Sequence, residues 1–342
     1  MTSANGDAYI GFMGEVRTLT VDAGEDGVRL DRWLRRRWPH LGQIQIHKLA
    51  RSGQLRVNGG RIKADTRLQA GQMVRVPPLP DAAPERSEGL ASDEIRFAKS
   101  LVLYEDDEVL ILNKPAGLAV QGGTKTHRHI DRLLSAWGEG LDRPRLAHRL
   151  DRDTSGVLAL GKTAKAAAML SGAFAKRRAE KTYWAIVKGN PKSFTGIIEQ
   201  PLAKLGTGDR ELMTPVEPKD PGAETAVTHF ATVSRAGPAA AWLALRPLTG
   251  RTHQLRAHML FIGCPILGDP KYNTPASIDA SGPLKLQLHA RRLVIGHPSG
   301  GLIDVEAPLS PEMEAGFERY GFDPSEAGEI NLPERRRHFH GH

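Results

Sequence analysis

The feature that most constrains this chain is the segment 148–156, HRLDRDTSG, which leads directly into the apolar run 157–160. A short apolar run of this kind is typical of a buried strand. Asp151 stands between Arg149 and Arg152, and a carboxylate flanked by positive charge is expected to stay ionised. At the end of a buried strand, such a carboxylate could attack the anomeric carbon of a sugar. The alternative is a surface turn of solvated charges, the usual fate of a charge run.

Positive charge is concentrated near the N-terminus. Residues 29–75 hold twelve Lys or Arg and two acidic residues, a net charge of +10 in a chain whose total is +8, so the remainder sums to −2. This focused field favours a polyphosphate partner whose binding weakens steeply with salt. A membrane surface is the less favoured partner, because no amphipathic segment with a large apolar face accompanies the charge.

Length and composition narrow the class of protein further. The 342 residues suffice for two domains with a real core. One cysteine, Cys264, excludes a disulfide framework and a cysteine-rich metal site. The N-terminus lacks a charged-then-apolar leader, and no apolar run approaches the ~18 residues of a membrane span. We therefore expect a soluble, cytoplasmic protein.

Residues 21–78 are expected to form a small domain that follows a flexible N-terminus over 1–20. Apolar residues recur at helical spacing over 28–38, with most arginines off that stripe. Pro39 ends this helix, and a second helix over 44–51 is closed by Gly53. A hairpin with an Asn-Gly-Gly turn at 58–60 and a strand over 73–76 complete the domain.

This order of elements, with its RLDRWL start, VNGG turn and AGQMVRV strand, resembles the small RNA-binding domain first recognised in a ribosomal small-subunit protein, the S-four type. The second helix departs from that pattern, because 41–43 (LGQ) replaces a serine-rich turn. The alternative is a helix-hairpin scaffold with a solvated basic face. A Pro-, Ala-, Ser- and Glu-rich linker follows over 79–94. The resemblance implies that cations of the two helices bind RNA: Arg32, Arg36, Lys48 and Arg51.

The remainder is expected to form a catalytic domain over 95–320 and a polar tail over 321–342. Three of its segments resemble, in order, the motifs of RluA/RluC-type RNA pseudouridine synthases: HRLD at 148–151, KTYWAIVKG at 181–189 and GRTHQLR at 250–256. The NKPAG at 113–117 is similar to the family's opening motif, although Gln121 replaces the more usual histidine. Lys114 is equally compatible with a structural role and with contact to substrate.

The resemblance is nearest to the RluC/RluD branch, which acts on large-subunit (23S) ribosomal RNA. It implies an α+β fold, with a catalytic domain built on a mixed, largely antiparallel β-sheet with flanking helices, beside the small α+β RNA-binding domain. The reaction would be the isomerisation of uridine to pseudouridine in a base flipped out of its RNA. It consumes nothing and needs no cofactor.

Roles for individual residues follow from the same resemblance. Asp151 is the implied catalytic aspartate, and Asp153 matches a structural position. Tyr183 would stack on the uracil and help to remove the proton from its carbon 5; the alternative is a core tyrosine bound to a backbone group. Arg256 would form a salt bridge with Asp151, since a guanidinium can hold a buried carboxylate in bidentate geometry.

Two further arginines are implied to contact RNA. Arg149 would occupy the space left by the flipped base, with a solvated arginine as the alternative, and Arg251 would hold a phosphate. We expect no metal site, because His253 and His258 are five residues apart and do not share a helical face. The sequence also lacks a P-loop and a GxGxxG fingerprint.

Two rival functions remain open at this point. One is the same chemistry on transfer RNA, and the other is a non-catalytic ribosome-assembly factor that uses the basic module alone. The chemical step also remains open, because Asp151 could attack the anomeric carbon or take a ribose proton to give a glycal. RNA is the expected partner of a monomeric protein.

Overall fold

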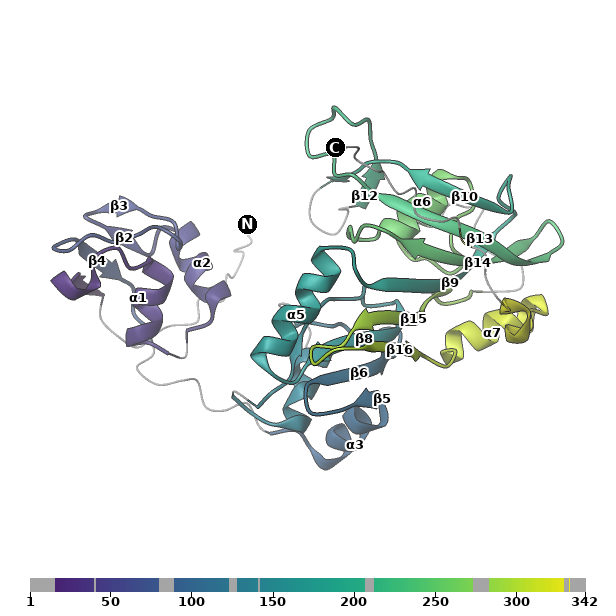
Figure 1. The fold of residues 1–342 in the computed structure, drawn as a ribbon. Coiled ribbons are helices and arrows are strands. Elements are labelled where there is room, and N and C mark those ends of the chain that lie inside the picture. The colour runs from purple at the N-terminus through teal and green to yellow at the C-terminus, as the bar shows by residue number, and fades with distance from the viewer. Residues whose placement is uncertain are drawn as a thin grey trace, which may run out of the picture. The chain divides into compact units, whose positions relative to one another are not determined.

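The structure, a computed structural model, describes residues 16–39, 41–79, 89–122, 128–140, 142–206, 212–272, 283–328 and 332. It divides into two compact units, Met1–Gly89 and Leu90–His342, each of which is described by itself (Figure 1). Within the described ranges, every helix is too short or too polar to cross a membrane.

The N-terminal unit packs two helices on an antiparallel sheet of order β1-β4-β2-β3. The buried side chains of Leu30, Trp33 and Leu34 form one stripe of the first helix and meet Val74 of the sheet. The hairpin turns at Asn58, which has a left-handed φ of 49°, as two-residue turns of this kind require. The elements are β1 (Arg17–Thr20), α1 (Leu30–Arg37), α2 (Gln43–Arg51), β2 (Arg56–Val57), β3 (Gly60–Arg61) and β4 (Met73–Val76).

The second unit is built on a ten-stranded mixed sheet of order β10-β13-β14-β9-β15-β8-β6-β5, with β16 beside β15 and β7 beside β8. The β15–β8 pair is parallel and the other pairs are antiparallel, which confirms the expected α+β class. The strands are β5 (Val102–Glu105), β6 (Val109–Lys114), β7 (Arg145–Leu146), β8 (Ser155–Gly161), β9 (Glu180–Lys188), β10 (Thr195–Glu199), β13 (Val227–Ala236), β14 (Ala240–Pro247), β15 (Leu288–Gly296) and β16 (Leu302–Glu306).

Helices and a small second sheet flank this large sheet (Figure 1). The small sheet pairs β11 (Leu202–Leu205) with β12 (Leu212–Pro215). The helices are α3 (Ser92–Ser100), α4 (Ile130–Leu133), α5 (Ala164–Ala175), α6 (Gln254–Phe261) and α7 (Pro311–Tyr320).

Strand β8 lies at the centre of the sheet, directly after the HRLD segment. All seven of its residues are buried, because Leu158 packs on one face with Leu133 and Val157 packs on the other with Leu170 of α5. Burial on both faces explains why the strand has a continuous apolar sequence. Gly156 has φ 108°, and a Cβ there would lie 2.2 Å from the carbonyl oxygen of Ala290 on β15. The HRLD loop therefore enters the sheet at a point that only glycine fits.

Three expected boundaries differ in the structure. Strand β1 begins at Arg17, inside the segment 1–20 that was expected to be flexible, because it pairs with β4; residues 1–15 lie outside the described ranges. Helix α3 starts at Ser92, inside the expected linker 79–94. The second unit continues beyond 320, since Phe322 is 7% exposed and packs against Trp242; the tail from 333 onward is outside the described ranges.

Candidate active site

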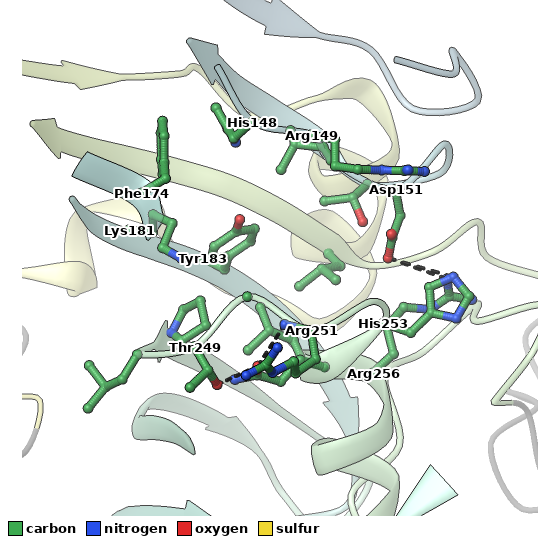
Figure 2. Close-up of a pocket in the computed structure, with 18 of the residues that line it drawn as sticks. His148, Arg149, Asp151, Phe174, Lys181, Tyr183, Thr249, Arg251, His253 and Arg256 are labelled. Atoms are coloured by element: carbon green, nitrogen blue, oxygen red, sulfur yellow. Dashed lines mark hydrogen bonds and ion pairs between the residues drawn. The ribbon is translucent and has the colours of Figure 1, made fainter. Parts of the chain in front are cut away.

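The three motif segments of the second unit line one cavity of about 440 Å³, a volume in the range of small-ligand pockets. Asp151 comes from the loop between β7 and β8, Tyr183 from β9 and Arg256 from the first turn of α6. Figure 2 shows these side chains converging on the cavity. Its charged lining groups, apart from histidine, are one carboxylate and five cations: Asp151, Arg149, Arg177, Lys181, Arg251 and Arg256.

The positive groups nearest to Asp151 come from α6 and not from its neighbours in the sequence. Nη1 of Arg256 lies 3.7 Å from Oδ2 of Asp151, and Nε2 of His253 lies 3.9 Å from the same oxygen. Arg152 instead pairs with Asp153 at 2.9 Å. Arg149 lines the cavity as an exposed side chain. Arg152 is thus engaged by Asp153, and the pairing of Arg256 with Asp151 has a longer distance than a bidentate ion pair.

Arg256 forms the expected bidentate ion pair with Asp269 and not with Asp151. Nε and Nη2 of Arg256 donate to Asp269 at 2.7 and 2.6 Å, and both side chains are almost fully buried. Asp269 also accepts the backbone N–H groups of Lys271 and Tyr272 at 2.8 and 3.0 Å. Burial raises the pKa of Asp269, but these donors, led by Arg256, lower it further, to below its usual value. Asp269 thus fixes the plane of the guanidinium and leaves Nη1 facing Asp151.

His253 is a second group of the site to which the resemblance assigned no role, although it lies within the GRTHQLR segment. It stands at the N-terminus of α6 with a left-handed φ of 50°. Its Nδ1 lies 3.2 Å from the hydroxyl of Tyr272, and that oxygen accepts the N–H of Met213 at 2.9 Å. The hydroxyl proton is then available for donation to Nδ1. In the tautomer that accepts it, the ring proton lies on Nε2, which faces Asp151. Burial lowers the pKa of His253 and favours this neutral form.

The loop that carries Arg251 and His253 is held by Gln254, which is buried. Its Oε1 accepts from Oγ1 of Thr249 at 2.6 Å and from the N–H of Arg251 at 3.1 Å. Its Nε2 donates to the carbonyl of Val227 and to Oγ1 of Thr228. Because the amide has partners at both ends, it gives the loop one conformation.

Arg251 lies at the edge of the cavity and is engaged by the protein. Its Nε donates to the carbonyl of Thr225 at 3.1 Å, and its Nη1 pairs with Glu224. The proposed phosphate contact would therefore have to share this guanidinium with an exposed carboxylate.

Tyr183 faces the cavity on the side of β9 that also carries Ala185 and Val187. Its hydroxyl makes no hydrogen bond with any residue that the structure describes, unlike a core tyrosine bound to a backbone group. Burial, with a contribution from the charge of Asp151, raises the pKa of Tyr183 well above its usual value. The side chain is therefore a neutral ring with a free hydroxyl, positioned to stack against a planar ligand.

Lys114 supports the loop that carries Asp151. This side chain is fully buried, and its Nζ donates to the carbonyls of Pro115, Leu118 and Arg152 at 2.8, 2.9 and 2.8 Å. Burial lowers its pKa to about 7. Because one of these bonds reaches Arg152, the NKPAG segment fixes the residue that follows Asp151. The structure favours the structural reading of Lys114.

The imidazoles of His148 and His258 are occupied by contacts within the protein. Nε2 of His148 accepts the N–H of Ala159 at 2.9 Å, its ring stacks on Phe174, and burial lowers its pKa to about 3. His258 lies between Thr228 and the carbonyl of Gln200. Across the described ranges, no three His, Cys, Asp or Glu side chains are grouped so as to hold a metal ion.

The cations expected to bind RNA through the N-terminal unit lie on its two helices. Arg29 and Arg37 of this unit pair with Asp31 and Glu25. The four expected residues are exposed and have no acidic partner within the described part of the chain: Arg32, Arg36, Lys48 and Arg51.

Comparison with known proteins gives one consistent result. The model of the RNA pseudouridylate synthase family matches residues 108–261. The chain is 35% identical over 313 residues to the ribosomal large subunit pseudouridine synthase C of Escherichia coli (strain K12), covering 87% of this chain and 95% of that protein. It is 33% identical over 312 residues to the protein of the same name from Vibrio vulnificus, covering 88% and 97%. The solved structure of human RNA Pseudouridylate Synthase Domain Containing 4 matches with a TM-score of 0.57 at 28% identity, over 68% of this chain and 98% of that chain.

Proposed function

Because this chain belongs to the RNA pseudouridylate synthase family and is itself a pseudouridine synthase, we propose that it modifies uridines of large-subunit (23S) ribosomal RNA with Asp151 as the catalytic aspartate. The substrate follows from the names of its relatives, which span nearly the whole chain. The observation that carries the catalytic assignment is the convergence of Asp151, Tyr183 and Arg256 on one cavity from three distant segments.

The cavity would receive a uridine flipped out of its RNA. The N1–C1′ bond breaks, the uracil turns, C5 bonds to C1′, and the proton lost from C5 is balanced by one gained at N1. Asp151 would act on the ribose, either by bonding to C1′ or by taking a ribose proton to give a glycal. Both routes need an accessible carboxylate beside the sugar, and the side chain of Asp151, which lines the cavity, is 24% exposed.

The neighbours of Asp151 would divide the remaining work. Arg256 Nη1 and His253 Nε2 would orient its carboxylate and balance its charge. Tyr183 would support the uracil ring by stacking. Because its pKa is raised well above the usual value, its hydroxyl would act in the protonated form, so that it could accept the C5 proton only as its own proton leaves.

The remaining assignments concern RNA binding. Arg149 would fill the space left by the flipped base, Arg251 would contact a phosphate at the edge of the cavity, and the exposed cations of α1 and α2 would bind flanking RNA. We further propose that the enzyme works as a cytoplasmic monomer without a metal. It would need no cofactor, because the reaction is an isomerisation that consumes nothing.

The test is a map of pseudouridines in ribosomal and transfer RNA from cells that lack this gene. We expect specific large-subunit positions to lose pseudouridine, to regain it with the wild-type gene, and to remain unmodified with an Asp151→Asn gene. Loss confined to transfer RNA would replace the proposed substrate with the rival one. An unchanged map in both RNAs would contradict the function.

A further inference from the structure

Three of the five cations that line the cavity, Arg149, Arg177 and Lys181, have no side-chain partner in the described protein. Arg149 is already assigned to the space left by the flipped base. Arg256 pairs with Asp269, and Arg251 pairs with Glu224. The side chains of Arg177 and Lys181 also line the cavity, but neither makes a hydrogen bond or ion pair with another described residue. Figure 2 shows Lys181 beside Tyr183 and Phe174, on the side of the tyrosine away from Asp151.

Arg177 occupies a backbone position that normally belongs to glycine. Helix α5 ends at Ala175, and the chain turns at Arg177 with a left-handed φ of 58°. The N–H of Arg177 donates to the carbonyl of Phe174 at 3.1 Å, and the N–H of Arg178 donates to that of Ala173 at 2.8 Å. This pair of bonds defines a Schellman turn, in which glycine is favoured because a left-handed conformation strains an L-residue.

The location of that strain points to a ligand. Among the described residues, the non-glycine positions with positive φ are Asn58, Arg177 and His253. Asn58 belongs to a hairpin turn, where asparagine is well tolerated. The other two line the cavity, and backbone strain that persists at a binding site commonly serves the placement of a side chain.

Lys181, on β9, presents a second uncompensated charge to the same cavity. Strand alternation places it on the face of β9 that carries Tyr183. Burial lowers its pKa to about 8, and no carboxylate acts to raise it again. A half-buried ammonium without a counter-charge is less favourable than a solvated one in the free protein, and an anionic ligand would supply the missing partner.

We propose that Arg177 and Lys181 form a phosphate subsite that binds a phosphodiester of the RNA strand next to the target uridine. The subsite rests on the proposed function, since it requires RNA in the cavity. It would hold the strand on the far side of Tyr183 while Asp151 acts on the ribose. The alternative is that both side chains only cover apolar surface with their stems and leave their charges in water.

The test compares full-length Arg177→Gly, Lys181→Met and Lys181→Arg with Lys176→Ala. Lys176 is an exposed cation at the end of α5 that does not line the cavity. The substrate is the ribosomal or transfer RNA transcript in which the wild-type enzyme forms pseudouridine. Kd, its dependence on salt, KM, kcat and the melting temperature are measured for each protein.

We expect Arg177→Gly and Lys181→Met to raise Kd and KM by about tenfold to a hundredfold, the loss of a charge-assisted hydrogen bond. Each should make the slope of log Kd against log salt shallower by about one, with a smaller change in kcat. Arg177→Gly should keep or raise the melting temperature, because glycine relieves the left-handed strain. Lys181→Arg should retain most of the affinity.

A double variant and a pH series sharpen the result. If both side chains contact one phosphate, the effects of Arg177→Gly and Lys181→Met on Kd should not multiply. Between pH 7 and 9 the wild-type affinity should fall more steeply than that of Lys181→Arg, because only the wild type loses the proton of Lys181. Any effect of Lys114, whose pKa is about 7, is common to both proteins. Burial lowers the pKa of His148 to about 3, lowers that of His253 and raises that of Tyr183. The other charged groups that line the cavity are Asp151 and arginines.

The outcomes separate the two proposals. Wild-type enzyme that forms no pseudouridine in ribosomal RNA would contradict the proposed function. Active wild-type enzyme whose Arg177→Gly and Lys181→Met variants match Lys176→Ala in Kd and salt dependence would overturn the subsite alone. Arg177→Gly that loses both affinity and melting temperature would also overturn the assignment of Arg177, because it would indicate a structural role.

Discussion

At the scale of single residues, Asp151 and Asp153 are two carboxylates in one segment with different surroundings. Asp151 lines the cavity beside Arg256 and His253, whereas Asp153 pairs with Arg152 outside it. We expect Asp151→Asn to reduce pseudouridine formation by about a hundredfold or more, because it removes the nucleophile or base with little change in volume. RNA affinity and melting temperature should remain close to wild type.

The matched control for this prediction is Asp153→Asn, which changes the same chemistry two residues away. It should keep its activity within about tenfold of wild type, a change of less than ~1.4 kcal/mol in the barrier. Asp151→Asn with activity in that same range, measured by single-turnover pseudouridine formation, would remove Asp151 from the mechanism.

Asp269 positions Arg256, although no motif in the sequence identified it. Its carboxylate accepts hydrogen bonds from Nε and Nη2 of the buried Arg256. Asp269→Ala would therefore leave this guanidinium with only the longer contact to Asp151. We expect a loss of about 3–5 kcal/mol in the free energy of unfolding, measured by urea denaturation, together with loss of activity. Glu224→Ala removes the exposed partner of Arg251 and should cost less than ~1 kcal/mol. Equal losses in the two variants would refute this account.

The stability that the Arg256–Asp269 ion pair contributes depends on pH. The pKa of Asp269 in the folded protein is lower than its ordinary value of 3.8. A depressed carboxyl pKa contributes stability that is complete above the unfolded pKa and disappears as pH falls through the folded one. The destabilisation caused by Asp269→Ala should therefore be constant at neutral pH and diminish below about pH 4.

The residues of the site differ in how far the sequence could predict them. Asp151, Tyr183 and Arg256 lie in three recognisable motifs, and all three line one cavity. Asp269 lies 13 residues after Arg256, beyond the reach of helical periodicity. A weak signal existed, because Asp269 and Asp279 are the acidic residues between 225 and 303, and a buried arginine needs one. His253 depends on the left-handed start of α6, which no periodic pattern encodes.

At the scale of elements, the HRLD loop depends on the close pairing of β8 with β15. Gly156→Ala would place a Cβ 2.2 Å from the carbonyl oxygen of Ala290 at a φ of 108°. We expect a loss of about 2–4 kcal/mol in stability from overpacking and backbone strain, and reduced activity because Asp151 precedes this strand.

Gly172 supplies the matched control for this substitution. It lies inside α5, and an added Cβ would meet no atom within 4 Å. Gly172→Ala should therefore stabilise the protein by about 0.5–1 kcal/mol through helix propensity. Urea denaturation of the two variants should give changes of opposite sign; a tolerated Gly156→Ala would contradict the tight β8–β15 contact.

Elements with strong local signals were predictable, and those made by distant contacts were not. The apolar run of β8 and the strand β4 are present where the sequence indicates. Lys176, Arg177 and Arg178 favour helix locally, but α5 ends at Ala175 because Arg177 adopts a left-handed turn. Strand β1 has four residues and exists through its pairing with β4.

At the scale of the whole molecule, each unit has a hydrophobic core of its own. The cluster around Trp33 and Leu34 is confined to the N-terminal unit, and separate clusters fill the second. Separate cores allow separate folding. The charge is also divided, because residues 29–75 carry a net +10, while the cavity and its motifs belong to the second unit.

We therefore expect a chain lacking residues 1–89 to fold, to keep the cavity and to form pseudouridine at high RNA concentration. Its Kd for RNA should rise, and the slope of log Kd against log salt should become shallower by nearly one for each phosphate that the protein no longer binds. Single-turnover rates at saturating RNA should change much less than Kd, because Asp151, Tyr183 and Arg256 all remain.

The matched control is a charge variant of the full chain that combines four substitutions: Arg32→Ala, Arg36→Ala, Lys48→Ala and Arg51→Ala. It should reproduce most of the change in slope without removing the fold of the unit. If the truncated chain binds RNA with an unchanged Kd and slope, the basic unit does not bind the substrate. If the truncated chain has a shallower slope but the variant with four substitutions keeps the wild-type slope, other residues of that unit bind the RNA.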